Sequence, residues 1–180
     1  MKSDFDKDVA IQAILYVAGR IGQRKDMHKI FKILYFADRM HISKYGRSIT
    51  GDTYIAMAYG PVPSNIDDIF KAVRGDSYFS DCADEFRRSF RFENKYIIKP
   101  LRDADMDYLS ESDTECLDHA ISLCRDKSFD ELVSMSHDLA WNNTNLNRAI
   151  SVKDIIREAG DDEEYAEYIS HKLELKRAFL

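Results

Sequence analysis

The chain has 180 residues, of which 44% are hydrophobic and 32% charged, and its formal net charge is -6. This length and composition are enough for one sizeable hydrophobic core, and they favour a single domain spanning residues 1–180. The first ten residues are rich in Lys and Asp, and no run of about 18 apolar residues occurs. These features argue against a secreted or membrane protein, so a cytoplasmic one is expected.

Charge is distributed unevenly along the chain. Residues 1–100 hold 17 Lys and Arg against 13 Asp and Glu, a net +4, whereas residues 101–180 hold 9 against 19, a net -10. The difference indicates either two oppositely charged faces of one domain or a charged binding partner. Because the chain as a whole is acidic, nucleic acid is not the expected partner, and a protein partner would be basic on part of its surface.

The sequence contains no pattern typical of a bound cofactor or a nucleophilic enzyme. Its cysteines, Cys82, Cys116 and Cys124, are odd in number and share no Cys-x-x-Cys spacing, so reduced thiols are expected. Ser136 and His137 are adjacent, and adjacent side chains diverge on a helix. The glycines are isolated and form no phosphate-binding loop.

Helix starts are marked by a Ser or Asp followed three residues later by an acidic residue, the pattern of a capping box. The pairs are Ser3/Asp6, Ser64/Asp67, Ser110/Asp113, Ser128/Glu131, Ser151/Asp154 and Asp161/Glu164. With Asp26 as a further start and Gly160 as a stop, they predict helices over residues 4–20, 26–44, 64–74, 111–125, 129–139, 152–159 and 162–177. Helix 26–44 is apolar on most sides, which predicts that it forms the centre of the core.

A segment near residues 86–100 lacks helical periodicity. Apolar and polar side chains alternate from Phe86 to Phe92, and two isoleucines follow the polar turn at residues 93–95. This pattern predicts a small antiparallel β-hairpin packed on a helical body. The expected fold class is therefore α+β, predominantly α-helical, with about six to seven helices around helix 26–44.

The segment 35–64 combines tyrosines, aspartates, a histidine, glycines and prolines at unusual density. Residues 49–59 predict a short extended bend with its turn at Gly51-Asp52. Residues 60–63 predict a rigid loop, and Ser64 would cap the helix that follows. Because a rigid loop loses little entropy on docking, we expect the partner-binding residues to be Tyr54, Tyr59 and Val62.

Polar residues on helix 26–44 allow two interpretations. Asp38 and His41 lie on neighbouring rows of the helix surface, and Asp52 or His137 could complete the metal site of a hydrolase-like enzyme. No HExxH-type spacing supports such a site. The favoured interpretation is that Asp38 and His41 hydrogen-bond the backbone of residues 50–52 and fasten the bend to the helix. A metal-dependent hydrolase stays the alternative.

A second alternative is a nucleic-acid-binding regulator. Arg87, Arg88 and Arg91 are interleaved with phenylalanines, and arginine can bind phosphate while an exposed phenylalanine stacks on a base. The favoured interpretation is structural, because alternation on a two-stranded sheet normally turns the aromatic face into the core and leaves the arginines in solvent.

The residues from Leu34 to Ser64 resemble, in order, the signature of the Panacea domain, the SocA-like antitoxin family also met among phage-associated proteins. The matching residues are Leu34-Tyr35-Phe36-Ala37-Asp38-Arg39, His41, Tyr45-Gly46-Arg47, Ile49-Thr50-Gly51-Asp52, Tyr54, Ala56-Met57 and Tyr59-Gly60-Pro61-Val62-Pro63-Ser64. The resemblance continues through residues 109–111, 136–137 and Trp141, and it is least distinct before residue 26 and after about residue 160.

The resemblance implies a small, mostly helical antitoxin that binds and neutralises the toxin encoded by the adjacent gene in a toxin-antitoxin system. No catalytic activity and no cofactor are expected. The signature implies a structural framework made of Tyr35, Asp38, His41, Gly46, Thr50, Gly51, Asp52, Gly60, Pro61 and Pro63. It leaves open whether the chain forms homo-oligomers and whether bound toxin is blocked or delivered to a protease. Because the 180 residues leave no room for an additional DNA-binding domain, autonomous operator binding is not expected.

Overall fold

The computed structural model of the protein describes residues 4–22, 25–76 and 83–179. Its helices are α1 (Lys7–Arg20), α2 (Met27–Tyr45), α3 (Ser64–Arg74), α4 (Ala83–Arg87), α5 (Glu111–Cys124), α6 (Phe129–Ser136), α7 (Leu139–Asn142), α8 (Val152–Glu158) and α9 (Glu163–Phe179), with a 3-10 turn at Met106–Tyr108. Two antiparallel hairpins join β1 (Tyr54–Met57) to β2 (Gly60–Pro63) and β3 (Phe90–Phe92) to β4 (Ile98–Pro100). The expected fold class is confirmed.

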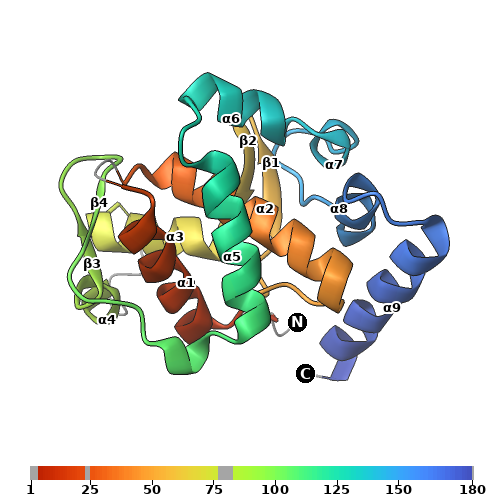
Figure 1. Ribbon diagram of the computed structural model, residues 1–180, viewed down its shortest axis with the longest axis horizontal. Coiled ribbons are helices and arrows are strands. Elements are labelled where there is room, and N and C mark those ends of the chain that lie inside the picture. The colour runs from red at the N-terminus through yellow and green to blue at the C-terminus, as the bar shows by residue number, and fades with distance from the viewer. Residues whose placement is uncertain (1–3, 23–24, 77–82, 180) are drawn as a thin grey trace.

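Helix α2 lies at the centre of the molecule. Helix α5 runs alongside it, and α1, α6, α8 and the β1–β2 hairpin also pack against it (Figure 1). Every residue from Ile30 to Asp38 is buried, so this central stretch of α2 is surrounded on all sides. Its Phe31 stacks on Phe70 of α3, with 5.3 Å between ring centroids. The prediction of a central core helix over residues 26–44 is confirmed.

Helix boundaries follow the local capping signals closely. Capping boxes begin α5 and α6, Asp26 caps α2, and Ser151 caps α8. Helix α9 begins at Glu163, with Asp162 as the residue that accepts from the first turn. The helix expected over 129–139 is two helices, because Asp138 caps the separate helix α7. Ser3 lies outside the described residues.

Helix α3 is capped by a residue distant in sequence. Ser64 was expected to cap it, but Ser64 is its first helical residue, and Pro63 at the cap position has no side-chain acceptor. The carboxylate of Asp52 takes this role: it accepts hydrogen bonds from the backbone N–H groups of Asn65 at 3.0 Å and Ile66 at 2.9 Å. The orphan donors at the helix start are therefore satisfied across a gap of more than ten residues.

The β1–β2 hairpin also differs from the expected bend and loop. The chain reverses at residues 58–59, not at Gly51-Asp52, and residues 60–63 form strand β2 rather than a loop. Strand β1 is covered on its other edge by residues 147–150, whose backbone bonds Tyr54 and Ala56. Strand β2 is thus an edge strand, where proline removes no ladder bond.

The second hairpin is confirmed but is shorter than expected. Ala83 and Phe86 are three residues apart and both buried, which is helical spacing, and the chain there forms α4. Only Phe90 to Phe92 pair with Ile98 to Pro100. The alternation that begins at Phe86 therefore spans a helix, a turn and a strand, and Phe86 is not part of the sheet.

Two of the cysteines lie in the core. Cys116 and Cys124 are buried and form no disulfide, and burial raises the pKa of their thiols to about 11 and about 12. This agrees with the expected reduced thiols, while Cys82 lies outside the described residues. Among the helices of the described ranges, none is long and apolar enough to cross a membrane.

The role of Asp52 can be tested by substitution. We predict that Asp52→Ala lowers the free energy of unfolding by about 2 kcal/mol, because the first turn of α3 loses its acceptor. Ser64→Ala is the matched control and should change it by less than about 0.5 kcal/mol, since its side chain caps nothing. Urea denaturation followed by circular dichroism measures both; equal losses would contradict the assignment.

Candidate functional site

Asp38 fastens the segment after α2 to that helix. Its side chain is 2% exposed and accepts hydrogen bonds from the Ile49 backbone N–H at 2.6 Å and the Tyr54 hydroxyl at 2.7 Å. Burial raises the pKa of Asp38 to about 6, although both donors favour the charged form. The expected structural role is found, but the partners are Ile49 and Tyr54, not the backbone of residues 50–52.

His41 joins α2 to α5. Its Nδ1 lies 2.8 Å from the carbonyl oxygen of Arg47 and therefore carries a hydrogen, while Nε2 lies 3.0 Å from Asp113 Oδ1 and 3.0 Å from Ser112 Oγ. Arg47 also binds Asp113, at 2.8 Å. Burial works to raise the pKa of Asp113, but hydrogen bonds from His41 and Ser110 and the charge of Arg47 hold it well below its usual range. His41 thus bonds residues other than the 50–52 backbone that was expected.

Thr50, Gly51 and Asp52 connect the same segment to two other parts of the chain. The Thr50 carbonyl accepts from the Asp6 backbone N–H at 2.9 Å, and Asp52 caps α3. Gly51 has a φ of 70°, and a Cβ there would collide with the backbone of Asp4. Gly46, with a φ of 67°, ends α2.

Asp38, His41 and Asp52 therefore face different partners and do not converge. Across residues 4–22, 25–76 and 83–179, no three His, Cys, Asp or Glu side chains gather as a metal site requires. His137, the other residue considered as a ligand, stacks on Trp141 with 3.7 Å between ring centroids. The geometry gives these residues structural contacts in place of a common metal.

Tyr35 ties α2 to α7. Its buried hydroxyl donates to Asp138 Oδ2 at 2.7 Å, and burial raises the pKa of Tyr35 well above its usual range. Asp138 also pairs with Arg39 at 3.2 Å and caps α7 through the Trp141 backbone N–H. The short helix that carries Trp141 is therefore held against the central helix by one shared carboxylate.

Lys32 is a site residue that the sequence interpretation missed. It is 3% exposed, and its Nζ donates to the carbonyl oxygen of Pro61 at 3.0 Å. Burial lowers the pKa of Lys32 to about 7, against the opposing charge of Asp138. Gly60, with a φ of 92°, leaves space for this contact, because a Cβ there would lie 2.6 Å from Nζ and would collide with Ser136 Oγ. The sequence did carry a signal for this site, namely the position of Lys32 within the apolar run of helix 26–44.

The turn of the β1–β2 hairpin is exposed. Tyr59 is 60% exposed and Met57 40%, and Val62 is half-buried. Tyr54, also expected to bind a partner, is only 3% exposed because its hydroxyl is needed at Asp38, so its assignment to a partner surface is wrong. The turn is fixed by Trp141, whose Nε1 donates to the Met57 carbonyl at 3.0 Å.

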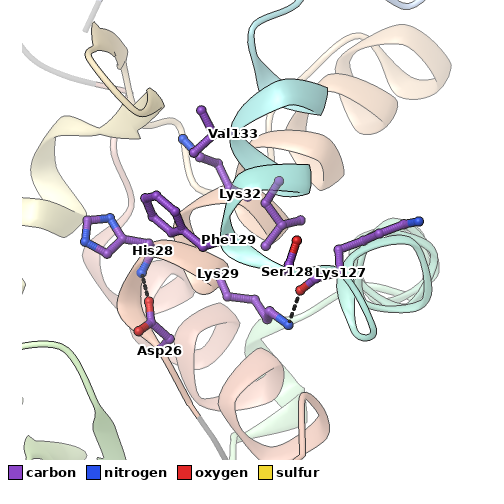
Figure 2. Close-up of a pocket in the computed structure, with 9 residues that line it drawn as sticks. Asp26, His28, Lys29, Lys32, Lys127, Ser128, Phe129 and Val133 are labelled. Atoms are coloured by element: carbon purple, nitrogen blue, oxygen red, sulfur yellow. Dashed lines mark hydrogen bonds between the residues drawn. The ribbon is translucent and has the colours of Figure 1, made fainter.

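A pocket of about 340 Å³ lies between the start of α2 and the start of α6, near this turn (Figure 2). In Figure 2 the rings of His28 and Phe129 stand close together, with Lys29 and Lys32 extending from α2. The lining residues are Asp26, His28, Lys29, Lys32, Lys127, Ser128, Phe129, Leu132 and Val133. The pocket combines apolar walls with three lysines.

The three arginines considered for nucleic-acid binding do not form one sheet face. Arg87 lies in α4 and donates to the carbonyls of Ala72 and Val73, which end α3. Arg88 lies in the following turn, and only Arg91 lies in β3. Phe90 is buried, so its ring is not available to stack on a base. The sheet that this alternative needs is absent from the described residues.

The contact between Tyr54 and Asp38 makes a pH-dependent prediction. Tyr54→Phe removes a donor to a buried carboxylate, so we expect a loss of about 2 kcal/mol in the free energy of unfolding at pH 8. Burial raises the folded-state pKa of Asp38 to about 6. Above that pH the folded protein carries the free-energy cost of a buried carboxylate, and below it protonation of Asp38 removes this cost.

The loss caused by Tyr54→Phe should therefore be smaller at pH 5, where Asp38 is largely protonated. Urea denaturation at both pH values measures it. Tyr59→Phe is the control, since the Tyr59 hydroxyl makes no hydrogen bond with the described residues, and it should have no effect at either pH. A loss independent of pH would argue against a charged Asp38 at this position.

Comparison with known proteins identifies the family of the chain. Residues 30–142 match the family described as Antitoxin SocA-like, Panacea domain, and this range contains most of α2, both hairpins, α5, α6 and α7. Searches of curated proteins and of solved structures gave no significant match. Since the matched range covers more than half of the chain and includes every framework residue from Tyr35 to Pro63, the chain belongs to the SocA-like antitoxin family with a Panacea domain.

Proposed function

We propose that this protein is the antitoxin of a toxin-antitoxin system and that it neutralises the toxin of the adjacent gene by direct protein binding. The family match over residues 30–142 carries the proposal. The fold supports it, because the polar side chains of the signature are used in internal contacts that make a rigid scaffold. We propose that the scaffold acts by binding and not by catalysis.

The exposed turn between β1 and β2 is the surface best suited to this role. Tyr59 is exposed on a turn whose flanking strands are fixed by two hydrogen bonds. Trp141 donates to the Met57 carbonyl, and Lys32 donates to the Pro61 carbonyl. The backbone of the turn therefore loses little freedom on binding, and an exposed tyrosine offers a large contact area with a polar end. Val62, half-buried on the neighbouring strand, extends the same surface.

Co-expression with the adjacent gene tests the proposal. We expect the adjacent gene alone to arrest growth and this protein to restore it, with a complex of the two recovered by co-purification. Unchanged toxicity in the presence of the folded protein would contradict the proposal.

The binding surface is tested by Tyr59→Ala, which we expect to weaken the complex at least tenfold, in the range of an interface hot spot. Tyr168→Ala is a matched control, because Tyr168 is exposed to the same degree, 62%, and lies on α9, far from the hairpin in Figure 1. Calorimetric titration of each variant with purified toxin gives the affinities. Equal affinities for the two variants would place the interface elsewhere.

A further inference from the structure

The pocket between α2 and α6 belongs to a larger aromatic surface. A row of rings runs from Tyr96 through His28 and Phe129 to Tyr59, with successive centroids 5.6, 5.7 and 5.5 Å apart. Tyr96 is 43% exposed and Phe129 45%. Burial lowers the pKa of His28, so its ring is neutral at pH 7 and packs as one of the row. The pocket thus opens beside the hairpin turn proposed to bind the toxin.

Two lysines of this surface, Lys29 and Lys32, are held by backbone carbonyls and not by ion pairs. Lys29 donates to the carbonyl oxygens of Arg125 at 2.8 Å and Lys127 at 2.9 Å, and Lys32 donates to Pro61. Within residues 4–22, 25–76 and 83–179, neither Lys29 nor Lys32 forms an ion pair. The one carboxylate in the lining, Asp26, is already used as the cap of α2. Two lysine amino groups therefore line the pocket without an ion-pair partner, and the charge of Asp138 acts on Lys32 from outside the lining.

We propose that this pocket is the anchor point for the toxin, and that it takes an Asp or Glu side chain of the toxin next to an aromatic or aliphatic side chain that packs on Phe129. The inference rests on the proposed function and specifies the partner of the same surface. The lysines of the pocket favour a carboxylate of the toxin by charge complementarity. The apolar walls formed by Phe129, Leu132 and Val133 favour an aromatic or aliphatic toxin side chain next to that carboxylate.

The length of the surface favours a protein segment over a small molecule. A volume of about 340 Å³ accommodates one or two side chains, while the aromatic row continues beyond the pocket in both directions, to Tyr59 and to Tyr96. A single peptide segment can bury an acidic side chain at Lys32 and cover both exposed rings. A small ligand would fill the pocket and leave Tyr59 and Tyr96 in solvent.

Binding of a carboxylate at Lys32 is coupled to proton uptake. The free ammonium has a pKa of about 7, so at pH 8 Lys32 is mostly neutral, and a bound carboxylate favours its charged form. The other charged or titratable groups near it are His28 and Lys29 on α2, Lys127 before α6, and His137 and Asp138 after it. His137 could also take up protons, so the uptake assigned to Lys32 is the part that Lys32→Met abolishes.

The experiment titrates the toxin of the adjacent gene into the wild type, Lys32→Met, Lys29→Met and Phe129→Ala. Each pocket variant should bind at least tenfold more weakly, and Lys44→Met should bind as the wild type does, because Lys44 lies at the far end of α2 and pairs with Glu115. Calorimetry at pH 8 in two buffers of different ionisation enthalpy should show proton uptake that is lost in Lys32→Met.

An acidic-residue scan of the toxin completes the test. One Asp→Asn or Glu→Gln substitution should weaken binding to the wild type but not to Lys32→Met, as a double-mutant cycle requires for a direct pair. If Lys32→Met lowers the melting temperature sharply, the affinities of Lys29→Met and Phe129→Ala decide whether the pocket binds the toxin. Lys29 is half-buried and Phe129 is exposed, so these substitutions should leave the fold intact.

Two outcomes overturn the inference while the proposed function stands. In the first, the wild type neutralises the toxin but all pocket variants bind it with unchanged affinity. In the second, ATP or GTP raises the melting temperature of the wild type but not of Lys32→Met, which would assign the pocket to a small anionic ligand. Failure of the wild type to neutralise the toxin would instead remove the proposed function itself.

Discussion

Burial of the central part of helix α2, residues 30–38 together with His41 and Ile42, is the constraint on which the rest of the structure depends. A helix surrounded on all sides must satisfy every polar group that it carries, because an unpaired buried donor or acceptor is strongly destabilising. Four such residues follow one another at intervals of three, and each finds a partner: Lys32, Tyr35, Asp38 and His41.

The interval of three gives these four side chains different directions. At about 100° per residue, each step of three turns the side chain by about 60° backward around the helix, so the four point to successive neighbours. They reach in turn strand β2, the start of α7, the segment that begins at Ile49, and helix α5. One helix thereby sets the position of four surrounding elements, which explains why polar residues that contact different parts of the chain appear together in one short stretch of sequence.

Features determined by neighbouring residues were predictable from sequence. Serine and aspartate caps act over three or four residues, so most helices and the central position of α2 were predicted correctly. Features determined by distant contacts were not. Asp52 displaces Ser64 as the cap of α3 only because the fold brings them together, and nothing local marks this.

The candidate site shows the same division. The structural character of Asp38 and His41 was predicted, but their partners depend on the path of the chain after α2. Tyr54 was expected at the surface because a tyrosine is buried only where its hydroxyl finds a hydrogen-bond partner. That partner is Asp38, and the sequence did not show that the two residues meet. The pocket could not be predicted, since Lys32 and Phe129 are almost one hundred residues apart and meet only through the packing of α6 on α2.

The prolines of β2 restrict how any protein can dock on this hairpin. An exposed edge strand normally offers N–H and carbonyl groups to which a foreign strand can pair. Pro61 and Pro63 have no N–H, and the Pro61 carbonyl is already taken by Lys32. A partner therefore cannot extend this sheet by strand addition and must bind through side chains. The same arrangement keeps copies of the protein from pairing edge to edge along β2.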